Sequence, residues 1–175
     1  MMRTALANAL EQLNEILVEL EKMPRQLADN VYREGNIGQH MRHVFDHMLA
    51  IKFAIADGVV DYDKRDRGNE VETDRLMASQ QLSLLSLWIK TEDFDNHRVA
   101  VISEIDCDNT QRMRFDSNLN REILYVINHT IHHAAHIKLV LAQFGITLPA
   151  HIGIAPGTAS FNRHSGRDEK IQCAH

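Results

Sequence analysis

A long stretch of this sequence, from Asn69 to Phe144, contains neither glycine nor proline. The whole chain of 175 residues has eight Gly and three Pro, and all of these lie before or after that stretch. Tight turns depend on these two residue types, so their scarcity favours a few long helices over a strand-rich sandwich or barrel. We therefore expect an all-α chain that folds as one domain over residues 1–175.

Apolar periodicity predicts two long helices in the first third of the chain. Leucines recur every three or four positions from Thr4 to Met23, and Pro24 follows as a stop signal. Asn36 is placed to cap a second helix that runs to about Asp57, where Gly58 ends it.

The next segment predicts a connection and a third helix. The residues from Val59 to Gly68 are rich in charge, which is typical of a solvated loop. Asn69 with Glu72 forms a capping-box pattern, which predicts a helix from there to about Lys90.

The spacing of apolar residues changes before the last predicted helix. Alternating residues within Thr91–Ser117, around the turn cluster Asp106–Asn109, predict a small β-hairpin. A helix follows from Asn118 to Phe144, and residues 146–175 form a tail without a sustained period. The sequence thus predicts a four-helix bundle with a hairpin inserted before the last helix.

Charge and hydropathy exclude several classes of function. The formal charge of −5 and the isoelectric point near 6.1 leave no basic surface for a nucleic acid. There is no apolar run long enough for a membrane span and no signal-peptide core, so we expect a cytoplasmic protein. The two cysteines, Cys107 and Cys173, form no metal-binding or disulfide framework.

The unusual feature of the composition is its 11 histidines. The last predicted helix contains His129, His132, His133 and His136. On a helical wheel His129 and His133 fall on the apolar stripe, about 40° apart, while the other two lie towards its edge. Imidazoles one turn apart can bind the same metal ion. The alternative is that these histidines are edge or core residues with hydrogen-bonded neighbours.

The second helix carries three further histidines, His40, His43 and His47. A catalytic metal site commonly uses three protein ligands and leaves a position open, so one of these residues would complete the set. On the helical wheel, His40 and His47 lie nearer the apolar stripe than His43, and the wheel does not choose between them.

These histidine segments, IGQHMRHVFDH and NHTIHHAAHI, resemble the DinB-like family of four-helix-bundle metalloproteins. In that family a histidine in an H-x-x-D or H-x-x-E setting joins an H-x-x-x-H pair on the last helix. The resemblance covers roughly Ile37 to Gly145 and assigns the metal ligands to His43, with its motif partner Asp46, and to His129 and His133. It also implies thiol S-transfer as a candidate reaction.

The sequence therefore predicts a metal-dependent enzyme, a transferase or hydrolase, with Zn, Ni or Fe bound by three histidines. We expect a small-molecule substrate and a homodimer, with no nucleic acid and no membrane as partner. The alternatives are a non-catalytic, stress-related bundle that binds a metal or small molecule, and a structural dimer module.

Other polar residues are weaker candidates for the site. Arg65 and Arg67 are placed where they could hold an anionic substrate, but a solvated connection is the simpler interpretation. Tyr62 and Tyr125 could donate to a substrate, although packing is the commoner role of such residues. Glu122 is expected at the surface.

Overall fold

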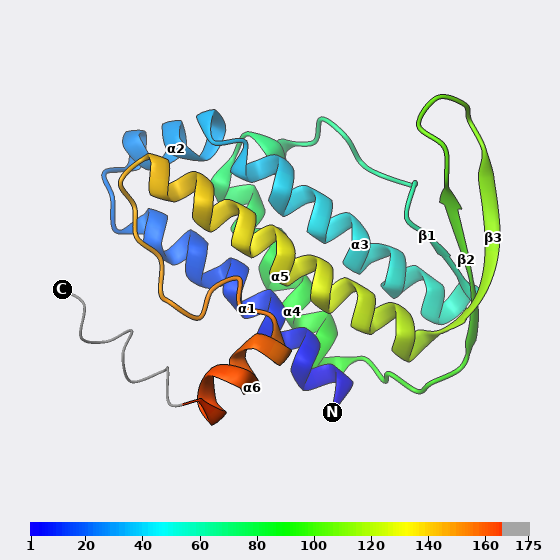
Figure 1. Cartoon of the computed structure of the whole chain (residues 1–175). Coiled ribbons are helices and arrows are strands. Elements are labelled where there is room, and N and C mark those ends of the chain that lie inside the picture. The colour runs from blue at the N-terminus through cyan, green and yellow to red at the C-terminus, as the bar shows by residue number, and fades with distance from the viewer. Residues whose placement is uncertain (166–175) are drawn as a thin grey trace.

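The computed structural model describes residues 1–165, and within them the chain is mostly α-helical with a small three-stranded sheet (Figure 1). The helices are α1 (Met2–Glu21), α2 (Arg25–Glu34), α3 (Ile37–Asp57), α4 (Arg75–Thr91), α5 (Leu119–Gln143) and α6 (Pro156–His164), with a 3-10 turn η1 at Glu70–Glu72. The strands are β1 (Val59–Asp61), β2 (Arg98–Glu104) and β3 (Arg112–Asn118). The expected predominance of helix is confirmed, and the sheet is larger than the two strands expected.

Four long helices enclose the core. α1 packs against α4 and α5, and α3 packs against the same two helices. The leucines that repeat along α1 are at most 2% exposed: Leu6, Leu10, Leu13, Leu17 and Leu20. Burial of this apolar stripe, rather than helix propensity alone, stabilises such a helix. No helix within residues 1–165 combines the length and apolar character needed to cross a membrane.

The two ends of α3 are set by residues in the left-handed region. Gly58 has φ 68° and ends the helix as expected. Asn36 also has a positive φ, 52°, and its side chain makes no capping hydrogen bond, so the predicted side-chain cap is wrong. Its main-chain oxygen accepts from the amide of Gln39 at 3.1 Å instead. Asparagine tolerates this conformation, which turns the chain sharply from α2 into α3.

The predicted start of the next helix is also wrong. The Asn69 side chain accepts from the amide of Val71, but this cap begins only η1. α4 starts at Arg75, where Asp74 caps it by accepting from the amide of Leu76. Both Asn69 and Asp74 are good N-cap residues, and a capping pattern alone does not tell how far a helix continues.

The sheet uses part of the segment expected to be a loop. β1 pairs parallel to β2, and β2 pairs antiparallel to β3. Val60 in β1 is fully buried, as are Val99 and Ala100 of β2 at 5% or less. The sequence did not predict this short strand, because its apolar part is only two residues long and charged residues follow Asp61.

Within residues 1–165, the two helices that the sequence did not predict each have a proline at their start. α2 begins directly after Pro24, and α6 begins at Pro156, within the tail expected to be irregular. Proline stops a preceding helix, but its fixed φ also suits the first turn of a new one. The rest of the tail, from residue 166 and including Cys173, lies outside the described residues.

Before α6, the tail lies across α1 and α5. Gly153 has φ 77°, and a Cβ there would come within 2.4 Å of the Cα of Ala135 on α5. Its amide donates to Gln12 of α1, and Lys138 of α5 donates to the carbonyl of Ile152. Glycine is therefore required at 153 for both conformation and close approach.

Candidate metal centre

Three of the predicted histidines meet between α3 and α5. Nε2 of His129 lies 2.9 Å from Nε2 of His43 and 3.2 Å from Nε2 of His133. The three residues offer one ligand atom each within 4.8 Å of one another, so together they could hold a metal ion. Nitrogens bound tetrahedrally to one Zn²⁺ lie about 3.3 Å apart, which follows from bond lengths of about 2.0–2.1 Å. The observed spacing is close to that value.

The helical repeat and the buried apolar residues of α5 orient His129 and His133 towards α3. His129 and His133 lie one turn apart on α5, with ring centroids 4.5 Å apart. The apolar neighbours Val126 and Ile137 are buried on the same helix. Their burial fixes the rotation of α5, so both imidazoles face α3. The three ligand candidates are only partly buried, so each remains in part exposed to solvent.

His47 lies beside the cluster as a flanking ring. Its Nδ1 is 2.9 Å from the main-chain oxygen of His43. A carbonyl can only accept, so this nitrogen carries the proton and Nε2 keeps a lone pair. The ring stacks on His129 at a centroid distance of 4.3 Å and on Tyr62 at 4.9 Å.

His40 lies on the other side, next to His133. The Nδ1 atoms of the two residues are 3.0 Å apart, and the His40 ring is 4.9 Å from that of His136. His132 and His136 are exposed. The helical wheel could not separate His40, His43 and His47, because it removes the position along the axis, and it is this position that sets His43 level with the α5 pair.

Burial keeps the clustered imidazoles neutral. It lowers the pKa of His43 from 6.5 to about 2 and that of His133 to about 3, with neighbouring histidines adding to the effect. Burial likewise lowers the pKa of His47 to about 4, and the pKa of His129 and His40 falls for the same first reason. Neutral imidazoles are the form that binds metal ions.

A second polar group, Glu122, lies about two turns before His129, towards the start of α5. Glu122 was expected at the surface but is fully buried. Its carboxylate accepts from the Tyr62 hydroxyl at 2.8 Å, from the Ser117 hydroxyl and from Arg121 at 2.8 Å. Burial, followed by the charge of Glu122, raises the pKa of Tyr62, so this tyrosine remains protonated and donates. The network links the turn after β1, where Tyr62 lies, to β3 and α5.

Asp46, the motif partner of His43, has a structural partner of its own. It is buried and pairs with Arg42, which also pairs with Glu72 of η1 at 2.5 Å. η1 approaches α3 closely, because a Cβ on Gly38 would lie 2.2 Å from the Glu72 carbonyl oxygen. This buried ion pair joins η1 to the start of α3, the turn that carries His43.

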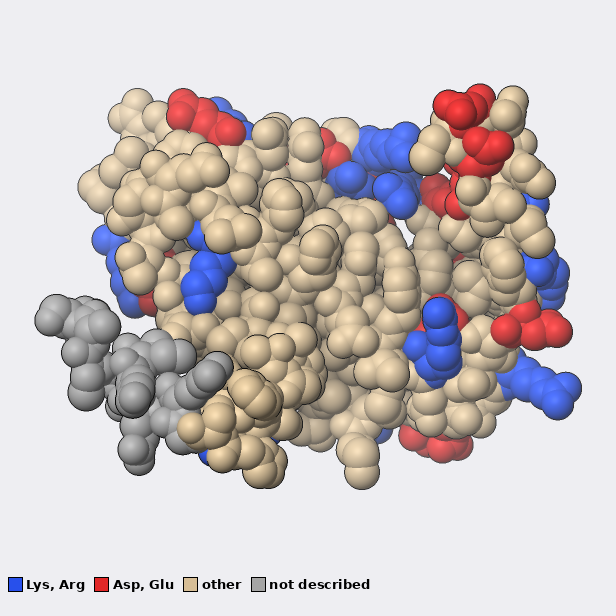
Figure 2. Space-filling view, viewed as in Figure 1, with Lys and Arg blue, Asp and Glu red and all other residues tan. Residues whose placement is uncertain are grey.

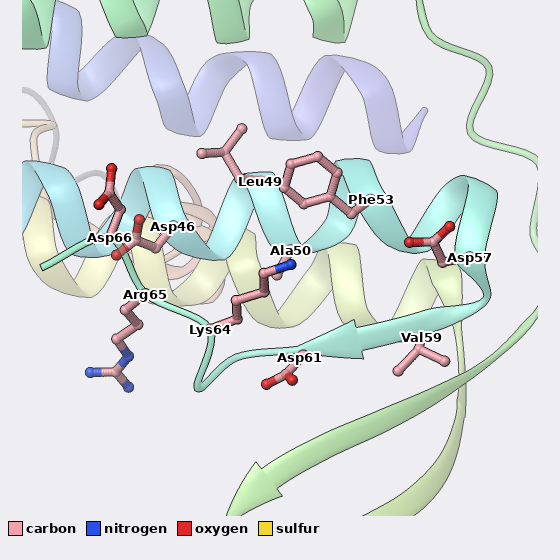
Figure 3. A pocket seen from close by; sticks show the side chains of 10 residues that line it. All are labelled: Asp46, Leu49, Ala50, Phe53, Asp57, Val59, Asp61, Lys64, Arg65 and Asp66. Atoms are coloured by element: carbon pink, nitrogen blue, oxygen red, sulfur yellow. The ribbon is translucent and has the colours of Figure 1, made fainter.

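Arg65 adds a positive charge near the cluster. Its Nε donates to the main-chain oxygen of Tyr62 at 3.2 Å, and its charge contributes to the lowered pKa of His43, His47 and His129. The side chain also borders a cavity of about 530 Å³ beside α3, where Figure 3 shows it projecting away from the helix. The loop after β1 is a basic area of the surface, opposite the acidic tip of the β2–β3 turn (Figure 2).

Comparisons with known proteins give one partial match. The chain is 32% identical over 106 residues to FK506-binding protein 5 of Rhizopus delemar, a match that covers 57% of this chain and 26% of that protein. The chain thus spans about a quarter of the length of this curated relative. No family model and no solved structure matches the chain.

Proposed function

We propose that this chain is a DinB-like bundle that binds one divalent metal ion through His43, His129 and His133. The observation that supports the proposal is the convergence of three neutral imidazole nitrogens at 2.9 and 3.2 Å. An all-imidazole set suits Zn²⁺, Ni²⁺ or Fe²⁺ rather than Mg²⁺ or Ca²⁺. The pairing of α1 and α3 with α4 and α5 supports the four-helix bundle, and the antiparallel β2–β3 pair supports the hairpin.

We further propose that the protein is an enzyme that transfers a thiol or hydrolyses a small molecule. A bound ion would supply Lewis acidity, lowering the pKa of a water or thiol placed on it. The chain itself would hold and shield the reacting group. Tyr125 stacks on His129 at 5.6 Å and covers it from one side. Arg65 supplies the positive charge that would attract an anionic part of the substrate.

The homodimer is also a proposal. Leu84 and Leu87 on α4 are 62% and 60% exposed. These two leucines lie one turn apart and form a small exposed apolar patch, which supports contact with another chain. Light scattering after size exclusion gives the mass and tests this directly.

Two measurements test the function. Protein purified without a nickel column, loaded with Zn²⁺, Ni²⁺ or Fe²⁺ and desalted should carry about one metal ion per chain by elemental analysis. No retained metal would contradict the site. The loaded protein is then assayed with a panel of thiols and electrophiles and a panel of hydrolysable esters and amides, with the His129→Ala protein as the matched control. Metal binding without turnover in either panel would favour the non-catalytic alternative.

The Rhizopus relative does not change this proposal. The name of that protein refers to FK506 binding, and the match covers only 26% of its length. That name therefore adds no substrate for the present chain.

A further inference from the structure

His133 has a close histidine contact at each of its two ring nitrogens. Nε2 faces Nε2 of His129 at 3.2 Å, on the side of the candidate metal centre. Nδ1 faces Nδ1 of His40 at 3.0 Å, on the opposite edge of the ring. Both separations are within hydrogen-bonding range, so the state of one nitrogen constrains the other.

A neutral imidazole carries one proton and one lone pair. His133 can serve as a metal ligand through Nε2 only if its proton is on Nδ1. That proton then needs an acceptor, and the atom placed to accept it is Nδ1 of His40. The reverse arrangement, in which His40 donates, would put the His133 proton on Nε2, where it would block the ligand position.

We propose that His40 is a positioning residue that holds His133 in the Nδ1–H tautomer, so that Nε2 points its lone pair at the metal position. This inference rests on the proposed metal site. A hydrogen bond to the other nitrogen of a ligating histidine is the usual way in which proteins fix its tautomer and ring orientation.

The same geometry makes His40 a partner of a ligand rather than a ligand. Its Nδ1 is directed to the edge of His133 that faces away from His129. Its ring lies between those of His133 and His136, with centroid distances of 5.1 and 4.9 Å. His40 therefore stands behind His133, as seen from His43 and His129.

Two substitutions of His40 separate the hydrogen bond from the bulk of the ring. His40→Asn places an amide oxygen near the former Nδ1 and keeps an acceptor, whereas His40→Leu removes it. His136→Leu is the matched control, because it alters the other neighbour of the His40 ring. Circular dichroism checks that each variant is folded.

The first readout needs no metal. Long-range ¹H–¹⁵N correlation spectra of the metal-free protein distinguish the two tautomers of His133. We expect the Nδ1–H form in the parent and in His40→Asn, and a mixture in His40→Leu. An Nε2–H form in the parent would overturn the proposal, even if the protein binds metal.

The second readout is metal affinity, measured by Zn²⁺ competition with a chromophoric chelator. We expect His40→Leu to bind about 10-fold more weakly, at the lower end of the effect of such partners. His40→Asn and His136→Leu should stay within about 3-fold of the parent. Parent-like affinity in folded His40→Leu would overturn the proposal. Complete loss, equal to that of His43→Ala, would also overturn it, because His40 would then be a ligand. A parent that binds no Zn²⁺ would instead refute the proposed function, and the tautomer spectra would still test His40.

Discussion

The chain buries polar groups in two neighbouring places, and it treats them differently. Around Glu122, one carboxylate receives donors from Tyr62, Ser117 and Arg121, so a buried charge is matched by hydrogen bonds within the protein. Around His129, the neighbours of the imidazole nitrogens are other imidazole nitrogens. No arrangement of protons satisfies these contacts fully, because Nε2 of His129 faces two other Nε2 atoms but carries only one proton or one lone pair.

This difference separates a structural polar cluster from a binding site. A satisfied network stabilises the fold and needs nothing further. A set of lone pairs that converge on one point costs stability when nothing binds there, and a shared cation would relieve that cost. The comparison therefore predicts that substitutions in the two places affect different properties.

The largest effect is expected at the three converging histidines. His43→Ala, His129→Ala and His133→Ala should each reduce metal affinity by more than about 100-fold, because the loss of one of three ligands exceeds the effect of an outer partner. Stability of the metal-free proteins should not fall as it does for a satisfied network, because removal of an imidazole also removes one of the lone pairs whose convergence costs stability. Chelator competition measures the first quantity and urea unfolding the second. If His43→Ala bound like the parent while His47→Ala did not, the ligand on α3 would have to be reassigned by one helical turn.

The Glu122 network should show the opposite pattern. Glu122→Gln keeps the size of the side chain but replaces an acceptor with a donor that faces the Tyr62 or Ser117 hydroxyl. We expect unfolding to become about 1–3 kcal/mol easier, the cost of a buried polar group without its partner. Metal affinity should remain within about 3-fold. A loss of affinity comparable to that of His129→Ala would show that the two clusters work as one.

Acidification should weaken the metal-free fold through the histidines. In the unfolded chain they take up protons near pH 6.5, whereas in the folded protein the pKa is about 2 for His43, about 3 for His133 and about 4 for His47. Below pH 6.5 the unfolded state therefore binds more protons, and the free energy of unfolding falls as the pH drops towards 4. The parent should lose more stability than His43→Ala between pH 7 and pH 4.5 in urea titrations. Equal slopes would contradict the burial of a neutral His43.

Sequence reasoning succeeded where a pattern is repeated along the chain. The leucine repeat of α1 and the apolar stripe of α5 each extend over several turns, and both helices lie close to their predicted bounds. It was wrong where one residue has two possible roles. Pro24 both stops one helix and precedes the next, and Asn69 caps a single turn rather than a long helix.

At the candidate metal centre, too, sequence reasoning succeeded for a pattern within one helix and failed for what depends on several elements. The spacing of His129 and His133 is a property of one helix, so the sequence indicated that they act together. The choice among the histidines of α3 depends on how α3 and α5 are aligned along their axes, which no single-helix pattern contains. Glu122 was misplaced for a related reason, since its partners come from β3 and from Tyr62, which directly follows β1, and β1 was not predicted.

The smallest effect is expected at His132, which lies on the same helix as His129 and His133 but outside the cluster of converging nitrogens. This residue is exposed, and its ring lies 5.4 Å from that of His133 and 6.3 Å from that of His136, without a hydrogen bond to the cluster. His132→Ala should therefore leave Zn²⁺ affinity within about 3-fold of the parent, well below the 10–100-fold loss typical of a hydrogen-bonded partner. Chelator competition measures this against His133→Ala, its neighbour in sequence, as the matched control. Equal losses at the two positions would mean that α5 is rotated from the orientation described, because only then would His132 rather than the apolar stripe face α3.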